Sequence, residues 1–370
     1  MVHVLHVIGR MGAGGAESLL MNIYRNIDRT KVQFDFVVHT KEKQFYDDEI
    51  IKLGGRIYHT ERFNIINYRR YRKWWDAFFE EHGEYDIVHG HINSSASIYL
   101  SCAKKHGIYT AVHSHNTKSV EKTARAFAFT VFSFPIRYLA DYYFACSRQA
   151  GIDRFGSKVV SSRRFRVLMN GIDGNRFVYS KEIRDKVRTE LGVDDSTLVI
   201  GHTGRFSEQK NHRFLIEVFE KVKEKNPDSQ LWLIGAGVLL EEIKKTVQEK
   251  NIQDSVVFLG ITDRVPEYLQ GMDVFVFPSI YEGLGIALIE AQAAGLPCVV
   301  SETIQEEADI GAGLIDRVSL SDRYDRWIET ILQAAKQERK NTLSFVKKAG
   351  YDIGDTARWI ETFYCKNQKA

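Results

Sequence analysis

Cysteine is scarce in this 370-residue chain. Its four cysteines lie far apart and form no C-x-x-C pair: Cys102, Cys146, Cys298 and Cys365. Neither a disulfide framework nor a cysteine zinc site is therefore suggested, and a reducing cytoplasm is the expected location. The N-terminal segment MVHVLHVIGR has no basic region followed by an apolar run, so we expect a first strand there and no secretion signal.

Long apolar runs and an excess of one charge are also lacking. The longest apolar stretch, Ala126 to Ile136, falls well short of the roughly 20 residues that span a bilayer, so no membrane crossing is expected. The net charge of +3 is too small to argue for a nucleic-acid partner, and no motif of that class occurs. No D-x-D pair is present to hold a nucleotide-bound metal. A mechanism that needs no metal and no other cofactor is therefore favoured.

What the chain does have is a regular alternation of short β-branched runs with longer helical patterns, which is typical of parallel sheets with crossover helices. The alternation restarts after the turn-forming segment Asn170 to Phe177. The predicted strands are Val2–Ile8, Phe34–His39, Ile57–His59, Ile87–His91, Thr110–His113, Phe144–Ser147, Val167–Met169, Thr197–His202, Leu231–Ile234, Val256–Leu259, Val274–Phe277 and Cys298–Val300.

We therefore predict an α/β protein with two Rossmann-like β/α/β domains, at residues 1–170 and 171–350. The remaining 351–370 segment carries Trp359, Ile360, Phe363 and Tyr364 at helical spacing. It is expected to form a helix that packs an apolar face, and the N-terminal domain is the proposed place.

The segment from Phe277 to Ala291 gives the strongest functional signal, because it follows a strand and opens a helix. Gly283, Leu284 and Gly285 form its turn, where glycines allow a backbone to approach a ligand and free amides offer an anion site. Glu282 precedes this turn and Glu290 follows it on the helix. The two carboxylates would flank a bound diphosphate and accept hydrogen bonds from hydroxyls, although spacing alone fits surface glutamates equally well.

A second cluster, Gly204 to Asn211, follows the strand that ends near His202. Arg205 and Lys210 lie in a turn that leads to a helix, where two cations could neutralise phosphate oxygens. Taken alone, such loop cations are more often solvated surface charges.

The N-terminal half offers two weaker candidates. Gly14 and Gly15 lie between the first strand and the first helix and could bind an anion or a sugar, but Glu17 breaks the G-x-G-x-x-G dinucleotide pattern. His113 and His115 follow a strand, where a loop histidine could contact a substrate. No carboxylate or cysteine completes a recognisable metal-ligand set with them, so no metal site is predicted.

Together these residues resemble family 4 glycosyltransferases, a retaining family with the GT-B architecture of two Rossmann-like domains facing a central cleft. Glu282 and Glu290 match the family's E-x7-E, and Gly204-Arg205 with Lys210-Asn211 match its G-R-x(n)-K-N stretch. Gly14-Gly15-Ala16-Glu17 resembles its G-G-x-E. The segment from His113 to Lys118-Ser119 is similar to its acceptor-side histidine segment.

The resemblance implies a role for each residue. Arg205 and Lys210 would contact the donor diphosphate, Glu290 the ribose hydroxyls, and Glu282 and His113 the transferred sugar. It implies a nucleotide-sugar donor, with uridine diphosphate as the preferred carrier, and an acceptor-side N-terminal domain. Retention without a protein nucleophile is also implied, with the departing phosphate taking the acceptor proton.

The resemblance is greatest to transferases of bacterial exopolysaccharide, capsule and lipopolysaccharide assembly, whose acceptors are saccharides or lipid-linked saccharides. Contact with an anionic membrane at the inner face of the cytoplasmic membrane would fit two basic patches, although charge runs are usually solvated surface. The patches are Arg62, Arg69, Arg70, Arg72 and Lys73 beside Trp74 and Trp75, and Arg154, Lys158, Arg163, Arg164 and Arg166. Phe127, Phe129, Phe132 and Phe134 could line an acceptor groove or a buried helix.

Two alternatives stay open at this point. A GT-B-fold sugar-nucleotide epimerase or hydrolase would bind the same donor without transferring its sugar to an acceptor. A non-catalytic sugar-nucleotide-binding module would have the same fold without transferase activity, since fold does not establish activity. The presence of Arg205, Lys210, Glu282 and Glu290 weighs against that module.

Overall fold

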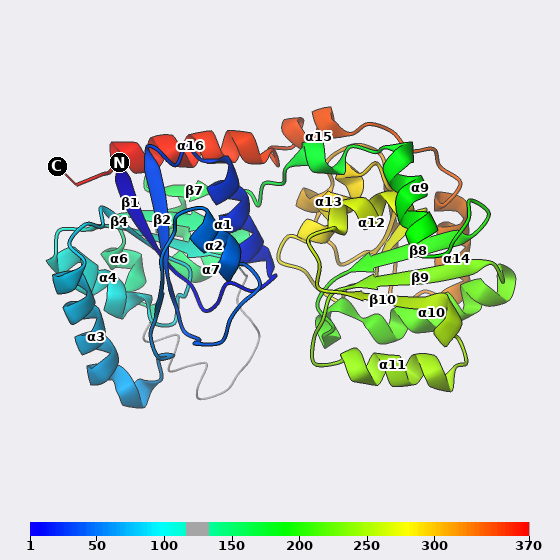
Figure 1. The fold of residues 1–370 in the computed structure, drawn as a ribbon, viewed down its shortest axis with the longest axis horizontal. Coiled ribbons are helices and arrows are strands. Elements are labelled where there is room, and N and C mark those ends of the chain that lie inside the picture. The colour runs from blue at the N-terminus through cyan, green and yellow to red at the C-terminus, as the bar shows by residue number, and fades with distance from the viewer. Residues whose placement is uncertain (116–132, 370) are drawn as a thin grey trace. The chain divides into compact units, whose positions relative to one another are not determined.

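The computed structural model describes residues 1–115 and 133–369, and the chain divides into two units (Figure 1). Unit 1 consists of Met1–Ile172 with Tyr351–Ala370, and unit 2 of Asp173–Gly350. These borders lie within two residues of the predicted domain limits at 170 and 350.

Unit 1 contains a seven-stranded parallel sheet in the order β3-β2-β1-β4-β5-β6-β7. Its strands are β1 Val2–Val7, β2 Val32–Val38, β3 Ile57–His59, β4 Ile87–Gly90, β5 Tyr109–Ser114, β6 Tyr142–Ala145 and β7 Phe165–Val167. Its helices are α1 Gly15–Asn26, α2 Asp47–Lys52, α3 Tyr68–Glu81, α4 Ala96–Lys105, α6 Ile136–Leu139, α7 Arg148–Phe155, α8 Ser157–Val160 and α16 Ile353–Lys366, with a 3-10 turn at Ile65–Asn67.

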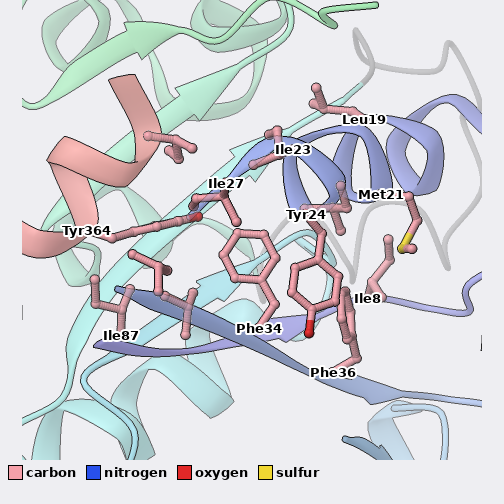
Figure 2. Close-up of a cluster of buried hydrophobic side chains, with 14 of the residues drawn as sticks. Ile8, Leu19, Met21, Ile23, Tyr24, Ile27, Phe34, Phe36, Ile87 and Tyr364 are labelled. Carbon is pink, nitrogen blue, oxygen red and sulfur yellow. The ribbon is translucent and has the colours of Figure 1, made fainter. Parts of the chain in front are cut away.

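Both faces of this sheet are covered, which is why its inner strands are almost wholly buried, whereas the edge strands β3 and β7 are only partly buried. On one face, α1 and α16 pack over β1 and β2, with Tyr24, Phe34 and Tyr364 in the cluster drawn in Figure 2. The Tyr24 and Phe34 rings stack with centroids 5.0 Å apart. On the other face, α3 and α4 bury Trp75 and Tyr99. The C-terminal helix thus forms part of the unit 1 core, and Tyr364 on it reaches β4 through a hydrogen bond to His89.

Unit 2 contains a six-stranded parallel sheet in the order β10-β9-β8-β11-β12-β13. Its strands are β8 Leu198–Thr203, β9 Ser229–Ile234, β10 Val256–Gly260, β11 Val274–Phe277, β12 Cys298–Ser301 and β13 Ile315–Val318. Its helices are α9 Lys181–Glu190, α10 His212–Lys225, α11 Leu240–Glu249, α12 Val265–Gly271, α13 Ile286–Ala293, α14 Tyr324–Ala334 and α15 Leu343–Lys348, with 3-10 turns at Gly174–Phe177, Glu208–Lys210, Gln253–Ser255 and Glu306–Ala308.

The two parallel sheets confirm the predicted class of two Rossmann-like domains. Each predicted strand overlaps an observed one, but β2, β6, β7 and β9 begin two residues earlier than predicted. The edge strand β13 was not predicted.

The strand order reverses between β1 and β4 in unit 1 and between β8 and β11 in unit 2. In open parallel sheets, ligands bind beyond the carboxyl ends of the strands at such a reversal. Ligand sites are therefore expected in the loops that follow these four strands and their neighbours.

Candidate functional site

In unit 2, the loops that follow β8 and β11 lie at the same edge of the sheet, because these strands are parallel neighbours. Lys210 ends the 3-10 turn that follows β8, and Glu282 lies in the loop between β11 and α13. Lys210 Nζ lies 2.8 Å from Glu282 Oε1. The two predicted clusters, more than 70 residues apart in the chain, therefore meet in one site.

This ion pair is largely removed from water, since the side chains of Lys210 and Glu282 are only 14% and 7% exposed. The Lys210 ammonium also lies 4.4 Å from the centroid of the Phe277 ring. Burial lowers the pKa of Lys210, and the Glu282 carboxylate opposes that shift. A buried pair of this kind is costly to break from one side, so each partner holds the other in place.

The loop carrying Glu282 is fixed by two glutamines. Gln209 accepts a hydrogen bond from Ile280 N at 2.8 Å through its backbone oxygen, and its side-chain amide donates to Tyr281 O at 2.9 Å. Gln305, in the loop after β12, donates to Glu282 O at 3.2 Å. Neither glutamine was singled out from the sequence, because a glutamine in a polar loop gives no recognisable pattern.

The helix α13 begins directly beyond this loop. Gly285 is its N-cap residue and has φ +77°, a conformation that favours glycine. No side chain of the described residues caps this N-terminus, so the first amides of α13 can serve an anion. Leu284, between the two glycines, is only 6% exposed.

Glu290 lies on α13, one helical turn after its start, and is half-buried. Desolvation raises the pKa of Glu290 to about 7, although Arg176 and Lys210 act in the opposite direction. Its charge therefore changes within the physiological range, unlike that of an ordinary surface glutamate. Arg176, in the turn at Gly174–Phe177, was not predicted to take part in this site.

Arg205 is exposed and forms no ion pair among the residues that the structure describes, yet its charge lowers the pKa of the nearby Lys210. Its loop is set by two further glycines that the sequence argument missed. A Cβ at Gly235 would lie 2.1 Å from Gly204 O, and one at Gly237 would lie 2.3 Å from Phe206 O. In the sequence, these glycines form a G-A-G segment directly after the predicted strand Leu231–Ile234.

The arrangement in unit 2 offers two cations, a free helix N-terminus and two carboxylates around one edge of the sheet. Cations and helix amides bind phosphate oxygens, and carboxylates accept hydrogen bonds from hydroxyls. The site is therefore suited to a ligand that has both phosphate and hydroxyl groups.

In unit 1, Gly14 is the N-cap residue of α1 and Gly15 is its first residue. A Cβ at Gly14 would lie 2.4 Å from Glu17 Oε2, so the small residue leaves room for the Glu17 carboxylate to fold back over the helix start. The two predicted glycines thus shape the start of α1 and leave its N-terminus without a side-chain cap among the described residues.

His113 lies inside β5 and is 1% exposed, so its predicted place in the loop after the strand was wrong. Strand pairing surrounds it with other histidines: His6, His89, His91 and His115. Burial lowers the pKa of each of these rings, so they are neutral at pH 7. Only the pair at 113 and 115 was apparent from the sequence, because His6 lies in β1, His89 in β4 and His91 directly after β4. Lys118 and Ser119 lie outside the described residues.

The first basic patch is partly neutralised. Arg70 pairs with Glu61, and Arg72 approaches Asp76. Trp75 is fully buried in the core, whereas contact with a membrane would require it to be exposed. Ile65 and Ile66 beside it are 42% and 97% exposed. In the second patch, Arg166 stacks on Trp359 at 4.0 Å from the ring centroid.

Of the predicted acceptor-groove phenylalanines, Phe134 is half exposed, at 51%. Phe127, Phe129 and Phe132 lie outside the described residues. Among the helices that the structure describes, none combines the length and apolar character needed to cross a bilayer.

Two family models match the chain. The model described as "Glycosyltransferase Family 4" matches residues 13–176, and that described as "Glycosyl transferases group 1" matches residues 183–346. The EpsF protein of Bacillus subtilis (strain 168), assigned as a glycosyltransferase, is 37% identical over 356 residues, covering 94% of this chain and 92% of its own. A UDP-Gal:alpha-D-GlcNAc-diphosphoundecaprenol alpha-1,3-galactosyltransferase of Escherichia coli is 29% identical and covers 59% of this chain and 58% of its own.

Solved structures share the fold over nearly the whole chain. HepE from Anabaena, in complex with UDP and glucose, gives a TM-score of 0.79 at 17% identity and covers 99% of this chain and 100% of its own. WaaG, a glycosyltransferase involved in lipopolysaccharide biosynthesis, gives a TM-score of 0.75 at 16% identity, covering 98% of this chain and 99% of its own. At these identities the likeness concerns the architecture alone.

Proposed function

This chain belongs to the family 4 glycosyltransferases, and from that membership we propose a donor, an acceptor and a role for each residue of its site. The donor is a nucleotide sugar carried on uridine diphosphate, and the acceptor is a saccharide or lipid-linked saccharide of bacterial polysaccharide assembly. The sugar is transferred with retention of configuration at the cytoplasmic face of the membrane.

The observation that carries this proposal is the Lys210–Glu282 pair at 2.8 Å, held beside the free N-terminus of α13. In our assignment, Lys210 and Arg205 bind the diphosphate together with the backbone of Gly283, Leu284 and Gly285. Glu290 accepts hydrogen bonds from the ribose hydroxyls, and Glu282 from hydroxyls of the transferred sugar.

Unit 1 is proposed as the acceptor side. Gly14 and Gly15 are assigned to the donor and His113 to the transferred sugar, on the strength of the family resemblance. Because His113 is 1% exposed, its contact with a sugar requires the surrounding side chains to move.

We propose that the bond between the anomeric carbon and the diphosphate oxygen breaks while the acceptor oxygen attacks the same face of the sugar. The departing phosphate takes the acceptor proton. Lys210, Arg205 and the α13 amides stabilise the negative charge that develops on the phosphate, so no metal is needed for the transfer. Glu282, paired with Lys210, orients the sugar and forms no covalent bond to it.

A donor-binding experiment tests this assignment. Calorimetric titration with uridine and guanosine diphosphates and their sugar derivatives, in a chelating buffer, should give selective one-site binding of the uridine compounds. Transfer to a lipid-linked acceptor, read by product analysis, separates a transferase from an epimerase, a hydrolase or a non-catalytic binder. Donor turnover that releases only free sugar or an epimer would overturn the proposal.

We also propose peripheral membrane contact through the surface around Ile65 and Ile66, which Arg62, Arg69 and Lys73 flank. Apolar side chains that enter the interface beside basic residues favour anionic lipids. Ile66→Asp should reduce sedimentation with phosphatidylglycerol vesicles, whereas Ile51→Asp, at a site 63% exposed on α2, should not. Equal binding of both variants would exclude this surface.

A further inference from the structure

A cluster of histidines occupies the carboxyl edge of the unit 1 sheet, at the reversal between β1 and β4. His91 and His115 follow β4 and β5, and His113 lies near the end of β5. Their imidazole nitrogens come within 4.8 Å of one another. His91 Nδ1 and His115 Nε2 are only 2.8 Å apart.

This spacing suits a shared ion. Zinc binds imidazole nitrogen at about 2.0–2.1 Å, which places two ligands of a tetrahedral ion about 3.3 Å apart. Small ring rotations would bring the nitrogens of these three residues to that separation. Since His115 is half-buried while His91 and His113 are buried, an ion would enter from the side of His115.

The ring of His113 gives an independent indication. Both of its nitrogens are buried, and neither has a hydrogen-bond partner within residues 1–115 and 133–369. The same holds for His115 Nδ1. An unsatisfied buried polar atom carries a desolvation cost, which coordination of an ion would remove. Burial also keeps these rings neutral, the form that ligates a metal.

A second layer of support surrounds the three rings. His6 Nδ1 lies 3.1 Å from His91 Nε2, so a His91 that ligates through Nδ1 can donate from Nε2 to His6. Metal-ligating histidines usually donate their other N–H to a carboxylate, a backbone carbonyl or water, which fixes the tautomer. Here the His6 nitrogen would take the place of that acceptor.

We propose that His91, His113 and His115 form a zinc site, with His6 as the outer partner and one coordination position left to water or another ligand. Imidazole ligands favour zinc and its neighbours copper and nickel over magnesium or calcium. The site lies in unit 1 and includes His113, so zinc ligation and the proposed contact with the transferred sugar are alternative uses of that ring. Zinc plays no part in the charge stabilisation proposed for transfer.

The alternative is a chain of neutral rings that runs from His6 through His91 to His115 by N–H···N hydrogen bonds. Such a chain explains the 2.8 Å and 3.1 Å contacts but leaves both nitrogens of His113 unsatisfied. The two interpretations differ in one measurable property, which is saturable binding of zinc.

The test uses the full-length, untagged protein, stripped with a chelator, and no sugar nucleotide, so its outcome does not depend on the proposed transferase function. Zinc is titrated by calorimetry, magnesium serves as the comparison ion, and cobalt reports the coordination geometry through its visible absorption. The variants are His115→Gln and His6→Ala, and the matched control is His106→Gln, another half-buried histidine of unit 1 outside the cluster.

We expect one zinc per chain in the wild type and in His106→Gln, with an intense tetrahedral cobalt spectrum. His6→Ala should weaken zinc binding about 10–100-fold, as loss of an outer partner does, and His115→Gln by at least as much. Absence of one-site zinc binding, or equal affinity in His115→Gln and His106→Gln, would overturn the proposal. If His115→Gln does not fold, the cobalt spectrum of the wild type tests the proposed site by itself. A weak octahedral spectrum would then overturn the proposal.

Discussion

The carboxyl edges of the two sheets occupy equivalent positions in the fold but differ in chemistry. In unit 2, the edge after β8 and β11 carries charged groups, with Lys210 and Glu282 in contact and Arg205 exposed. In unit 1, the edge after β1, β4 and β5 carries buried neutral histidines, of which His113 has no hydrogen-bond partner among the residues that the structure describes.

This difference shows that the topology decides where a site forms and the residue types decide what it can bind. Charged groups and helix amides at the unit 2 edge suit an anionic donor, whereas uncharged rings at the unit 1 edge suit a neutral group or a soft metal ion. Substitutions at each edge test whether the two edges differ in function as they differ in charge.

The largest effect is expected at the charged edge. Lys210→Ala removes a cation that is proposed to bind the leaving phosphate and leaves Glu282 buried without its partner, so kcat should fall about 100–1000-fold. Release of nucleoside diphosphate measures the loss, and Lys181→Ala, on an exposed turn of α9, is the control. A folded Lys210→Ala protein with wild-type turnover would show that the charged edge takes no part in the transfer.

Gly235→Ala tests the backbone that supports Arg205. The new Cβ would lie 2.1 Å from Gly204 O at a residue with φ +135°, so unfolding should become easier by about 3 kcal/mol. Gly192→Ala, with φ +69° and no heavy atom within 4 Å, isolates the conformational strain alone and should cost about 1–2 kcal/mol. Equal denaturation midpoints for the two variants would show that the close approach at Gly235 is not restrictive.

The pH dependence of donor binding tests the role proposed for Glu290 at the charged edge. Since its pKa is raised to about 7, the carboxylate that is proposed to accept hydrogen bonds from ribose forms as the pH rises through 7. Donor affinity should therefore increase between pH 6 and pH 8. Glu290→Gln should bind the donor about tenfold more weakly, with little pH dependence. Glu249→Gln on α11 is the control, and an unchanged pH profile in Glu290→Gln would contradict the assignment.

The smallest effect concerns acid stability at the histidine edge. Burial lowers the pKa of His115 from its usual 6.5 to about 4, so the unfolded chain binds more protons than the folded one between these values. Stability is therefore lost as the pH falls from 6.5 towards 4. In metal-free protein, His115→Gln should reduce the loss of unfolding free energy between pH 7 and pH 5.5 by about 1 kcal/mol. An equal loss in both proteins would show that His115 is not neutral when folded.

Most of the fold was predictable because its strands are buried on both faces and appear as continuous apolar runs. β13 escaped prediction since it is an edge strand that contains Asp316 and Arg317, so its pattern is that of a loop. The ends of β6 and β7 were displaced because their aromatic and basic residues give no clear boundary.

The residues proposed for the unit 2 site could be singled out from the sequence, because each loop carries a local motif. The supporting residues could not, since Gln209, Gln305 and Gly235 act through contacts with distant loops. The histidine cluster could not be foreseen for the same reason: His91 and His113 are 22 residues apart in the chain and meet only through strand pairing.

The most direct measurement is a calorimetric titration of uridine diphosphate into the wild type, Glu290→Gln and Lys210→Ala, with a chelator present and each protein shown to be folded. The account predicts one-site, metal-free binding to the wild type that is weakened in both variants. Absence of binding to the wild type, or the same Kd in all three, would contradict the claim that the charged edge of unit 2 holds the donor.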